Sequence, residues 1–233
     1  MSVSLTYEAS LWDAGAHVVA GVDEVGRGAL AGPVTVGVCA VGRCDSWPEG
    51  LADSKELNHA RRVAMADALG TFAGTGFGLA RAVGHSSPAE IDAHGIIAAL
   101  RLAGLRALAQ IVDSGLTVDA VLLDGKHDWL TAPPATLFDN PALFDDPATA
   151  SALPAKPLPP VTMVIKGDGL CASIAAGSVI AKVERDALMA AAHADHPEYG
   201  WESNKGYGAA GHLEAIRTLG PTPLHRRSWR LPV

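Results

Sequence analysis

Cysteine is scarce in this 233-residue sequence, and long hydrophobic runs are missing. The three cysteines, Cys39, Cys44 and Cys171, form no CxxC pair and are odd in number. This pattern predicts neither a disulfide framework nor a thiolate zinc site. No stretch approaches the roughly 18 uninterrupted apolar residues that cross a bilayer, and residues 1–17 lack the basic start and apolar segment of a secretory signal. We therefore expect a soluble, cytoplasmic protein without a membrane partner.

An excess of positive charge is missing as well. The chain has 25 Asp and Glu residues against 18 Lys and Arg, a net charge of −7. This balance argues against a protein that coats nucleic acid unspecifically, although local basic patches can still steer a polyanion. Residues 201–233 form such a region, with five Lys and Arg against two Glu, a local charge of +3. The overall charge therefore does not exclude a nuclease.

What is present predicts a single α/β domain with its own core, since 48% of the residues are apolar. A first half dominated by strands, followed by alternating strand and helix, indicates a layered α/β fold with a helical C-terminal extension. Capping boxes at Asp53–Glu56 and Ser87–Glu90 predict the starts of two helices. The expected strands cover residues 17–25, 31–41, 76–83, 118–124 and 161–166, the last two buried, and the expected helices cover 53–69, 87–112 and about 170–194.

A proline-rich stretch interrupts this pattern at residues 131–160. It holds eight of the 15 prolines, which predicts a loop or insertion, not part of the core. We expect one catalytic domain over residues 1–233, with a core at about 16–194, the insertion at 131–160 and a helical C-terminal segment at 195–233.

Four carboxylates follow three of the predicted strands. Asp23 and Glu24 end the first strand, Asp124 ends a buried strand, and Asp168 comes just after the last strand. Because the carboxyl ends of strands border the ligand site in open α/β sheets, these acids are expected to converge. Converging carboxylates repel one another, and a hard divalent cation with oxygen ligands relieves that repulsion. The pattern predicts Mg²⁺ or Mn²⁺, not zinc.

Each acid also has a purely structural interpretation. Asp124 precedes Gly125 in what could be an ordinary turn, Asp168 could cap a helix, and consecutive Asp23 and Glu24 would point to opposite faces of a regular strand. Both side chains, Asp23 and Glu24, can reach the same site only if they lie at a strand end or at a bulge. The coincidence of all four acids favours the metal site.

Two glycine-rich elements are candidate substrate contacts. Gly26, Arg27 and Gly28 directly follow the first acids, and two glycines let backbone amides approach a phosphate or sugar while the arginine adds a charged donor. Tyr207 lies between glycines in residues 204–208, where an aromatic ring can stack on a base or sugar. The structural alternative for both is a tight turn.

Two lysines complete the candidates. Lys55 and Lys166 are possible phosphate contacts, although a lysine is more often only solvated.

These motifs resemble those of the bacterial ribonuclease HII family, a type 2 ribonuclease H. The resemblance covers nearly the whole chain and rests on GVDEVGRGALAGPV at 21–34, LADSKEL at 51–57, LLDG at 122–125, VIKGDGLCASIAAGSVIAKVERD at 164–186, NKGYGAAGH at 204–212 and HRRSW at 225–229. It implies a ribonuclease H-like fold with a mixed central sheet flanked by helices and a helical C-terminal extension.

The resemblance also implies an activity and a set of site residues. The metal-binding and catalytic acids would be Asp23, Glu24, Asp124 and Asp168. The Gly-Arg-Gly element and Tyr207 would recognise the junction between ribonucleotide and deoxyribonucleotide. The implied reaction is endonucleolytic cleavage of RNA in RNA/DNA hybrids, and cleavage 5′ of single ribonucleotides in duplex DNA, as needed for ribonucleotide excision repair. Two Mg²⁺ or Mn²⁺ ions would act in a monomer and leave 5′-phosphate and 3′-OH ends.

The sequence departs from the family pattern at two places. The linker between the third and fourth acids is commonly short, whereas here 43 residues separate Asp124 from Asp168. Gly177 stands where the pattern usually has alanine, which should cost about 1 kcal/mol of helix stability. Two other functions remain open: a broader metal-dependent nuclease or phosphatase of the same fold, and a hybrid-binding module without catalysis.

Overall fold

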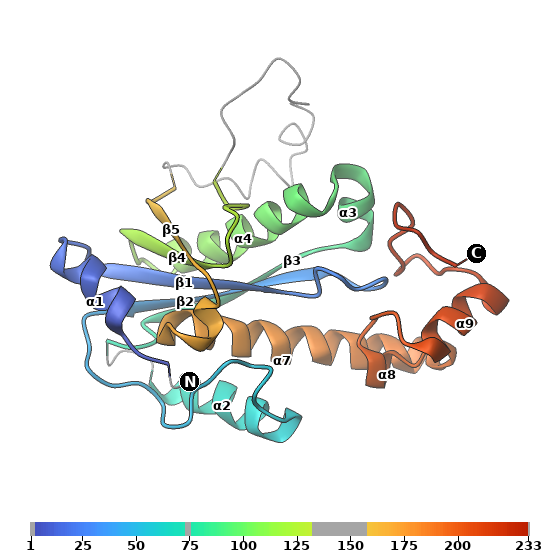
Figure 1. The fold of residues 1–233 in the computed structure, drawn as a ribbon, viewed down its shortest axis with the longest axis horizontal. Coiled ribbons are helices and arrows are strands. Elements are labelled where there is room, and N and C mark those ends of the chain that lie inside the picture. Colours follow the sequence, from blue (N-terminus) through green and yellow to red (C-terminus); the bar gives the residue numbers. More distant parts are fainter. Residues whose placement is uncertain (1–2, 73–75, 132–157, 233) are drawn as a thin grey trace, which may run out of the picture.

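A five-stranded sheet forms the centre of the molecule (Figure 1). A computed structural model describes residues 3–72, 76–131 and 158–232. The strands are β1 Val18–Val25, β2 Val34–Gly42, β3 Ala80–Ser86, β4 Ala120–Asp124 and β5 Val161–Val164. Their order across the sheet is β3-β2-β1-β4-β5.

The sheet is mixed, as expected. β1 pairs with β2 in antiparallel register from Val18 opposite Gly42 to Val25 opposite Thr35. β2 pairs with β3 in the same manner, whereas β4 runs parallel to both β1 and β5. β1 therefore lies at the centre of the sheet, and the carboxyl ends of β1, β4 and β5 lie at the same edge.

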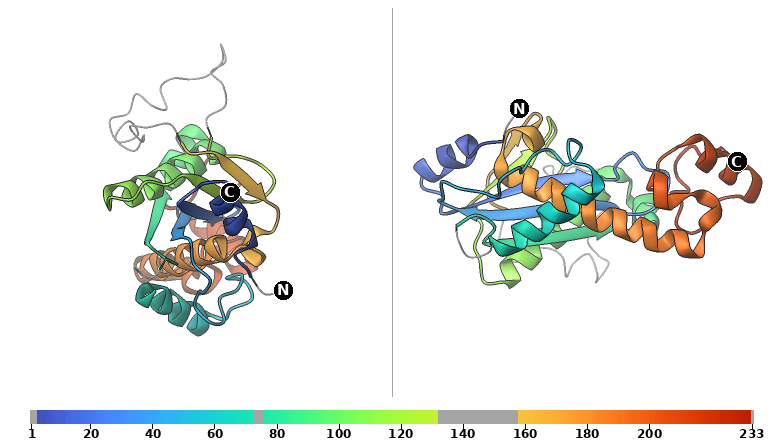
Figure 2. Two further views of the ribbon diagram at one scale, coloured as in Figure 1. Left: turned by 90° about the vertical axis from the view of Figure 1, so that its left-hand side faces the viewer. Right: turned by 90° about the horizontal axis from the view of Figure 1, so that it is seen from below.

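Helices cover both faces of the sheet, and the views in Figure 2 show the same layers from other directions. One face is covered by α3 and α4, and the other by α7 with α2 outside it. Each face has its own apolar core, because neighbouring residues of β1 such as Val19 and Ala20 point to opposite sides. The helices are α1 Thr6–Asp13, α2 His59–Thr71, α3 Pro88–His94, α4 Ile96–Asp113, α7 Ala172–Asp195, α8 Trp201–Asn204 and α9 Ala210–Leu219, with 3₁₀ turns η1 Gly167–Gly169 and η2 Pro197–Tyr199.

Glycines let α7 approach the centre of the sheet closely. A Cβ atom on Gly21 would lie 2.2 Å from the Ser173 carbonyl carbon, and one on Gly37 would lie 2.1 Å from the Gly177 oxygen. Gly177 itself has no room for a methyl group, because its Cβ would lie 2.9 Å from the Gly37 oxygen. The departure from the usual alanine thus has a packing reason, and α7 carries its residues directly under β1.

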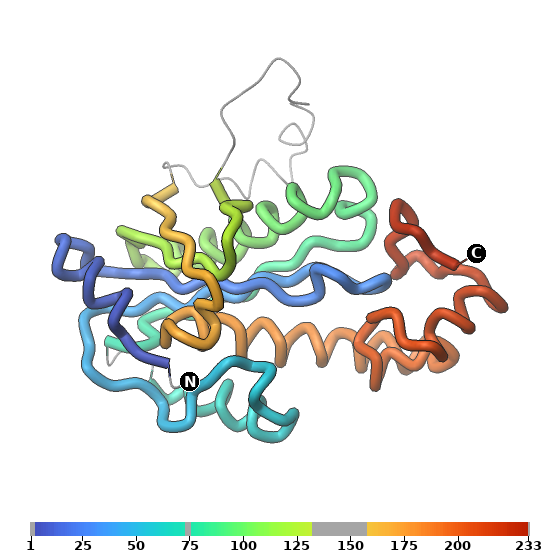
Figure 3. Tube along the Cα trace, in the orientation of Figure 1, coloured from blue at the N-terminus to red at the C-terminus, as the bar shows by residue number. Residues whose placement is uncertain are grey.

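The C-terminal segment packs at the far end of α7, beside the loop that connects β1 to β2 (Figure 3). An isolated β-bridge joins Ala31 in this loop to His225. Tyr199, Trp201 and Ile216 fill a third small core there. The helical extension expected from the sequence is therefore attached to the loop that follows Asp23 and Glu24.

Several predicted elements need correction. The helix expected at 53–69 begins at His59, and Asn58, not Asp53, caps it. The Ser87–Glu90 capping box is confirmed, but Gly95, at φ 79°, divides the expected helix into α3 and α4. β5 is an exposed edge strand, not a buried one, because among the described strands it pairs with β4 alone.

Two other expectations concern the insertion and membrane helices. Most of the predicted insertion at 131–160 lies outside the described residues. No helix in the described part of the chain has the length and apolar character to cross a membrane.

Candidate active site

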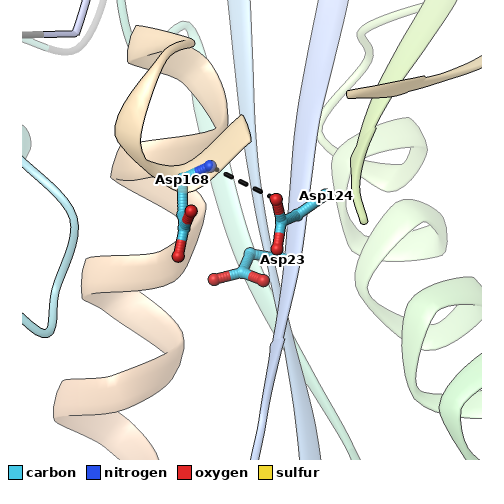
Figure 4. Close-up of side chains that lie close together, drawn as sticks. All are labelled: Asp23, Asp124 and Asp168. Atoms are coloured by element: carbon cyan, nitrogen blue, oxygen red, sulfur yellow. Dashed lines mark hydrogen bonds between the residues drawn. The ribbon is translucent and has the colours of Figure 1, made fainter. Parts of the chain in front are cut away.

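Three aspartates meet at the carboxyl edge of the sheet (Figure 4). Asp23 lies near the end of β1, Asp124 is the last residue of β4, and Asp168 lies in η1, directly after β5. One carboxylate oxygen of each lies within 4.8 Å of the others. The parallel register of β1 and β4 places Val22 opposite Leu123, so the next residue of each strand is an acid. The predicted convergence is confirmed for these three.

Backbone hydrogen bonds hold the carboxylates of Asp124 and Asp23 in place. Asp124 Oδ1 accepts the Gly167 amide at 2.6 Å and the Asp168 amide at 3.4 Å, which ties the turn to the end of β4. Asp23 Oδ1 accepts the amide of Glu24 at 2.8 Å. The structural alternative for Asp168 is wrong, because Cys171 occupies the N-cap of α7. Asp168 is left to face the other acids.

The triad concentrates negative charge in a buried place. Asp23 and Asp168 are each only 5% exposed. Burial raises the pKa of Asp23 well above its usual value, and the neighbouring carboxylates raise that pKa further, against a hydrogen bond from Ser178 that lowers it. Burial and the Asp168 charge also raise the pKa of Asp124. A divalent cation would offset this repulsion, and a set of carboxylate oxygens suits Mg²⁺ or Mn²⁺.

Glu24 lies beside the triad but is not one of the three clustered acids. Its Oε1 atom is 3.3 Å from Nη1 of Arg27. Burial raises the pKa of Glu24, the nearby Arg27 cation lowers it, and the Asp124 charge raises it. The β1 strand therefore directs Asp23 into the cluster and Glu24 towards the Gly-Arg-Gly loop.

Lys55, which the sequence suggested as a phosphate contact, reaches the triad in the structure. Its Nζ atom lies 2.5 Å from Asp168 Oδ2 and 3.8 Å from Asp53 Oδ2. Residues 53–55 form a turn in which Asp53 accepts the Lys55 amide, so the predicted capping box is instead the bend that directs this lysine.

Lys166 is placed differently. It is exposed and has a left-handed backbone, with φ 58°. No ion pair to an acid is formed by its side chain among the described residues, so its ammonium group is available to a ligand near Asp168.

The two glycine-rich elements lie against each other. The amides of Leu30 and Ala31 donate to the Gly206 carbonyl at 2.8 and 3.2 Å. Tyr207 follows immediately, 39% exposed. Its ring lies 5.6 Å from the guanidinium carbon of Arg185. Two motifs that are about 180 residues apart in sequence thus lie next to each other, and β1 connects the first of them to Asp23 and Glu24.

The two glycines of the Gly-Arg-Gly loop differ in their surroundings. Gly26 has φ 81°, and a Cβ atom there would lie 2.0 Å from Arg185 Nε. Gly28 has an ordinary φ, and a Cβ atom there would meet nothing within 4 Å. The fold itself therefore requires glycine at 26 but not at 28, where the chain faces open space.

Sequence reasoning missed three residues that support the site. Ser178 hydrogen-bonds to Asp23 and to the buried Ser54 hydroxyl, the latter at 2.9 Å. Arg185 and Arg226 are fully buried beneath the two glycine-rich elements. All three lie in the blocks that carry the family resemblance, but no local pattern distinguishes a buried arginine from an exposed one.

The mixed sheet and the carboxylate triad together define an α/β protein with an acidic cluster that could hold a divalent ion, as the metal sites of nucleases do. The family model described as Ribonuclease HII matches residues 20–231. The chain therefore belongs to the ribonuclease HII family. A ribonuclease HII from Streptomyces avermitilis is 45% identical over 215 residues, covering 92% of this chain and 78% of that protein. The protein is accordingly a hydrolytic endoribonuclease of a metal-dependent family that acts on RNA/DNA substrates.

Solved structures agree on the fold. The ribonuclease H2 of Pyrococcus horikoshii superposes with a TM-score of 0.61 at 24% identity, over 92% of this chain and 95% of that one. Bst-RNase HIII in complex with Mn²⁺ gives a TM-score of 0.60 at 20% identity, over 94% of this chain and 68% of the other. The predicted ribonuclease H-like fold is confirmed.

Proposed function

We propose that this endoribonuclease cleaves the RNA strand of RNA/DNA hybrids and cuts 5′ of a single ribonucleotide embedded in duplex DNA. The observation that carries this proposal is the continuity of two surfaces. β1 supplies Asp23 to the acid triad and then leads directly into Gly26–Gly28, and the same loop is joined through the Leu30 and Ala31 amides to the Gly206 carbonyl, next to Tyr207. A group that reads a sugar would thus sit beside the groups that cleave its phosphodiester.

Asp23, Asp124 and Asp168 would hold divalent cations, and Glu24 would complete the shell from the side of the loop. Their donor atoms are carboxylate oxygens, which suit Mg²⁺ and Mn²⁺, and the structurally similar Bst-RNase HIII is known in complex with Mn²⁺. Two such ions, when bound, would activate a water for in-line attack and stabilise the leaving 3′ oxygen, giving 5′-phosphate and 3′-OH ends.

The remaining site residues would bind and orient the substrate. Arg27 is partly exposed beside Glu24 and offers a forked charged donor for a phosphate. Lys55 contacts Asp168 through its ammonium group, and Lys166 lies two residues before Asp168 in the sequence, so both would bind phosphates of the strand that is cut. The exposed ring of Tyr207 would stack on the sugar or base at the junction.

Recognition of one ribonucleotide in DNA must involve its 2′-OH, because this group is the only covalent difference from the neighbouring sugars. The open space at Gly28 lets a sugar approach the backbone closely. The Gly-Arg-Gly loop is therefore the part of the site suited to reading the hydroxyl.

The test is cleavage of a DNA duplex that carries one ribonucleotide, with the all-DNA duplex and a continuous RNA/DNA hybrid beside it. We expect one cut 5′ of the ribonucleotide in Mg²⁺ or Mn²⁺, no cut in EDTA, and no cut of the all-DNA duplex. Equal cutting of both duplexes would indicate a broader nuclease. Metal-independent binding without turnover would indicate a binding module. Either result would overturn the proposal.

A further inference from the structure

Arg226 is a buried cation that forms no ion pair with an acid in the described part of the chain. The side chains of Arg226 and Arg185 are both 0% exposed. Within the described part of the chain, no carboxylate oxygen lies within 4.0 Å of either guanidinium group, although five other arginines form such pairs. Burying a cation is costly unless hydrogen bonds replace its water. The hydrogen bonds that the Arg226 guanidinium makes to backbone carbonyls therefore indicate what this buried residue does.

The guanidinium group of Arg226 binds the backbone of the Gly-Arg-Gly loop from below. Nη2 donates to the Gly26 carbonyl at 2.7 Å, and Nη1 donates to the Arg27 carbonyl at 2.9 Å. Nε and Nη2 also donate to the Gly32 carbonyl, at 3.2 and 3.1 Å. The rigid, planar guanidinium group thus fixes the two successive carbonyls of Gly26 and Arg27 and connects them to the Gly32 carbonyl, at the other end of the same loop.

Fixing these carbonyls also fixes the direction of the amides that follow them. The described peptide bonds are all trans, so the N–H group of each peptide points away from its carbonyl. The amides of Arg27 and Gly28 therefore point away from Arg226, towards the exposed side of the loop. Among the described residues, neither the Arg27 amide nor the Gly28 amide has a hydrogen-bond acceptor. Two adjacent donors are thus left free on a surface with open space at Gly28.

The anchor itself is rigid. The Arg226 amide donates to the Leu30 carbonyl at 2.9 Å, and the Gly32 amide donates to the Leu224 carbonyl at 2.8 Å. The guanidinium carbon also lies 5.0 Å from the ring centre of Trp229. Burial and the neighbouring Arg185 cation lower the pKa of Arg226 to about 9, so that it stays charged at neutral pH.

We propose that Arg226 is a positioning residue for ribonucleotide recognition, because its guanidinium group holds the Arg27 and Gly28 amides ready to donate to the 2′-OH oxygen of the substrate. This inference rests on the proposed function. Donors that are already oriented lose little entropy on binding, so they add affinity only where a matching acceptor is present. Arg226 would then contribute to the preference for a ribonucleotide and not to general affinity for DNA.

The experiment compares Arg226→Lys with the wild-type protein and with Arg227→Lys. Lysine keeps the charge but cannot donate to the Gly26, Arg27 and Gly32 carbonyls together. Arg227 is the next residue, is exposed, and binds Asp92 only through its backbone amide. Dissociation constants in EDTA are measured for a duplex with one ribonucleotide and for the matching all-DNA duplex.

We expect Arg226→Lys to weaken binding of the ribonucleotide duplex at least about fivefold, as expected for loss of about 1 kcal/mol, and to leave the all-DNA constant unchanged. Arg227→Lys should keep the wild-type ratio between the two constants. A wild-type ratio in folded Arg226→Lys, or an equal loss on both duplexes, would overturn the inference and leave the proposed function intact. Equal binding of both duplexes by the wild-type protein would also overturn the inference, whereas the proposed function is decided separately by the cleavage assay.

A second measurement needs no variant and so does not depend on Arg226→Lys folding. Amide resonances of Arg27 and Gly28 are followed by NMR while each duplex is added to the wild-type protein. The inference expects both amides to shift strongly with the ribonucleotide duplex and less with the all-DNA duplex. Identical responses to the two duplexes would contradict it.

Discussion

Lys55 Nζ lies 2.5 Å from Asp168 Oδ2, so an ammonium group already balances part of the charge of the carboxylate triad. The contact raises the pKa of Lys55, although its partial burial acts in the opposite direction. The lysine comes from the turn before α2 and the aspartate from η1, 113 residues later. A cation held so close to the acids repels a divalent ion that binds to the same carboxylates.

We therefore expect Lys55→Met to bind Mn²⁺ more tightly, by at least about fivefold for removal of about 1 kcal/mol of repulsion. The same variant should have a higher KM for an RNA/DNA hybrid, because a phosphate contact is lost. Calorimetric titration with Mn²⁺ and steady-state cleavage measure the two effects. Lys55→Arg keeps the charge and should retain wild-type metal affinity. Weaker Mn²⁺ binding by Lys55→Met would show that the lysine supports the metal site and does not oppose it.

Asp23→Asn tests whether the buried carboxylate is kept for metal binding at a cost to the fold. Since burial raises the pKa of Asp23, its stabilising contribution is greatest below the unfolded pKa and is lost as the pH rises through the folded one. At pH 8 in EDTA the variant should be more stable, by on the order of 1 kcal/mol, while cleavage in Mg²⁺ or Mn²⁺ is abolished. Urea unfolding measures the stability of the variant, and a gel assay measures its cleavage of the substrate. Full activity of Asp23→Asn in Mn²⁺ would show that the Asp23 carboxylate is not needed to bind the catalytic metal.

Much of this site was predictable from sequence because Asp23, Asp124 and Asp168 each follow a short apolar run, and the carboxyl ends of neighbouring parallel strands meet at one edge of a sheet. The side chain of Glu24 was harder to place, because two successive strand residues point to opposite faces and only the structure shows which faces the cluster. The role of Arg226 could not be predicted, since it depends on contacts with carbonyls about 200 residues away.

Secondary structure was less predictable where a tertiary contact overrides a local signal. Asp53–Glu56 fits a capping box, yet the chain forms a turn there in which Lys55 contacts Asp168, and α2 begins only after its N-cap residue Asn58. The long apolar stripe after Ser87 predicts one helix, but Gly95 takes a left-handed conformation and starts a second one. Spacing alone does not reveal either break.

The glycines of the Gly-Arg-Gly loop should separate folding from recognition. Gly26→Ala places a methyl group against Arg185 in a left-handed conformation, so it should lower the free energy of unfolding by about 1–3 kcal/mol. Gly28→Ala meets no neighbour and should leave stability unchanged within about 0.5 kcal/mol, but weaken binding of a ribonucleotide-containing duplex. Thermal unfolding and equilibrium binding measure both. Unchanged binding by Gly28→Ala would show that the substrate does not approach the loop there.

Lys166 keeps a side chain where glycine would be more stable. Its φ of 58° lies in the left-handed region, which costs roughly 1–2 kcal/mol for a residue with a Cβ atom. Lys166→Gly should therefore stabilise the protein by about 1 kcal/mol and weaken hybrid binding. The slope of the logarithm of affinity against the logarithm of salt concentration should fall by about 0.9, one phosphate contact. An unchanged slope in the stabilised variant would show that Lys166 is only solvated.

The buried histidines His212 and His225 make the stability of the protein depend on pH. His225 Nε2 lies 3.1 Å from His212 Nε2, and His225 Nδ1 accepts the Thr222 amide at 3.0 Å. Burial and the neighbouring His212 together lower the pKa of His225 to about 4. A histidine that stays neutral in the fold but binds a proton near pH 6.5 when unfolded stabilises the protein above pH 6.5. That contribution is lost as the pH falls towards 4.

From pH 7 to pH 5 the His225 contribution to the free energy of unfolding should therefore fall by about 2 kcal/mol. Urea unfolding at the two pH values is compared for the wild-type protein, His225→Asn and His59→Asn, the last an exposed control at the start of α2. The control should lose as much stability as the wild-type protein, and His225→Asn about 2 kcal/mol less. His212 Nδ1 binds the Tyr207 carbonyl at 2.8 Å, so the histidine pair would connect pH to the segment that carries Tyr207. Equal losses for all three proteins would show that the acid sensitivity of the fold comes from other groups and that the pair makes no such connection.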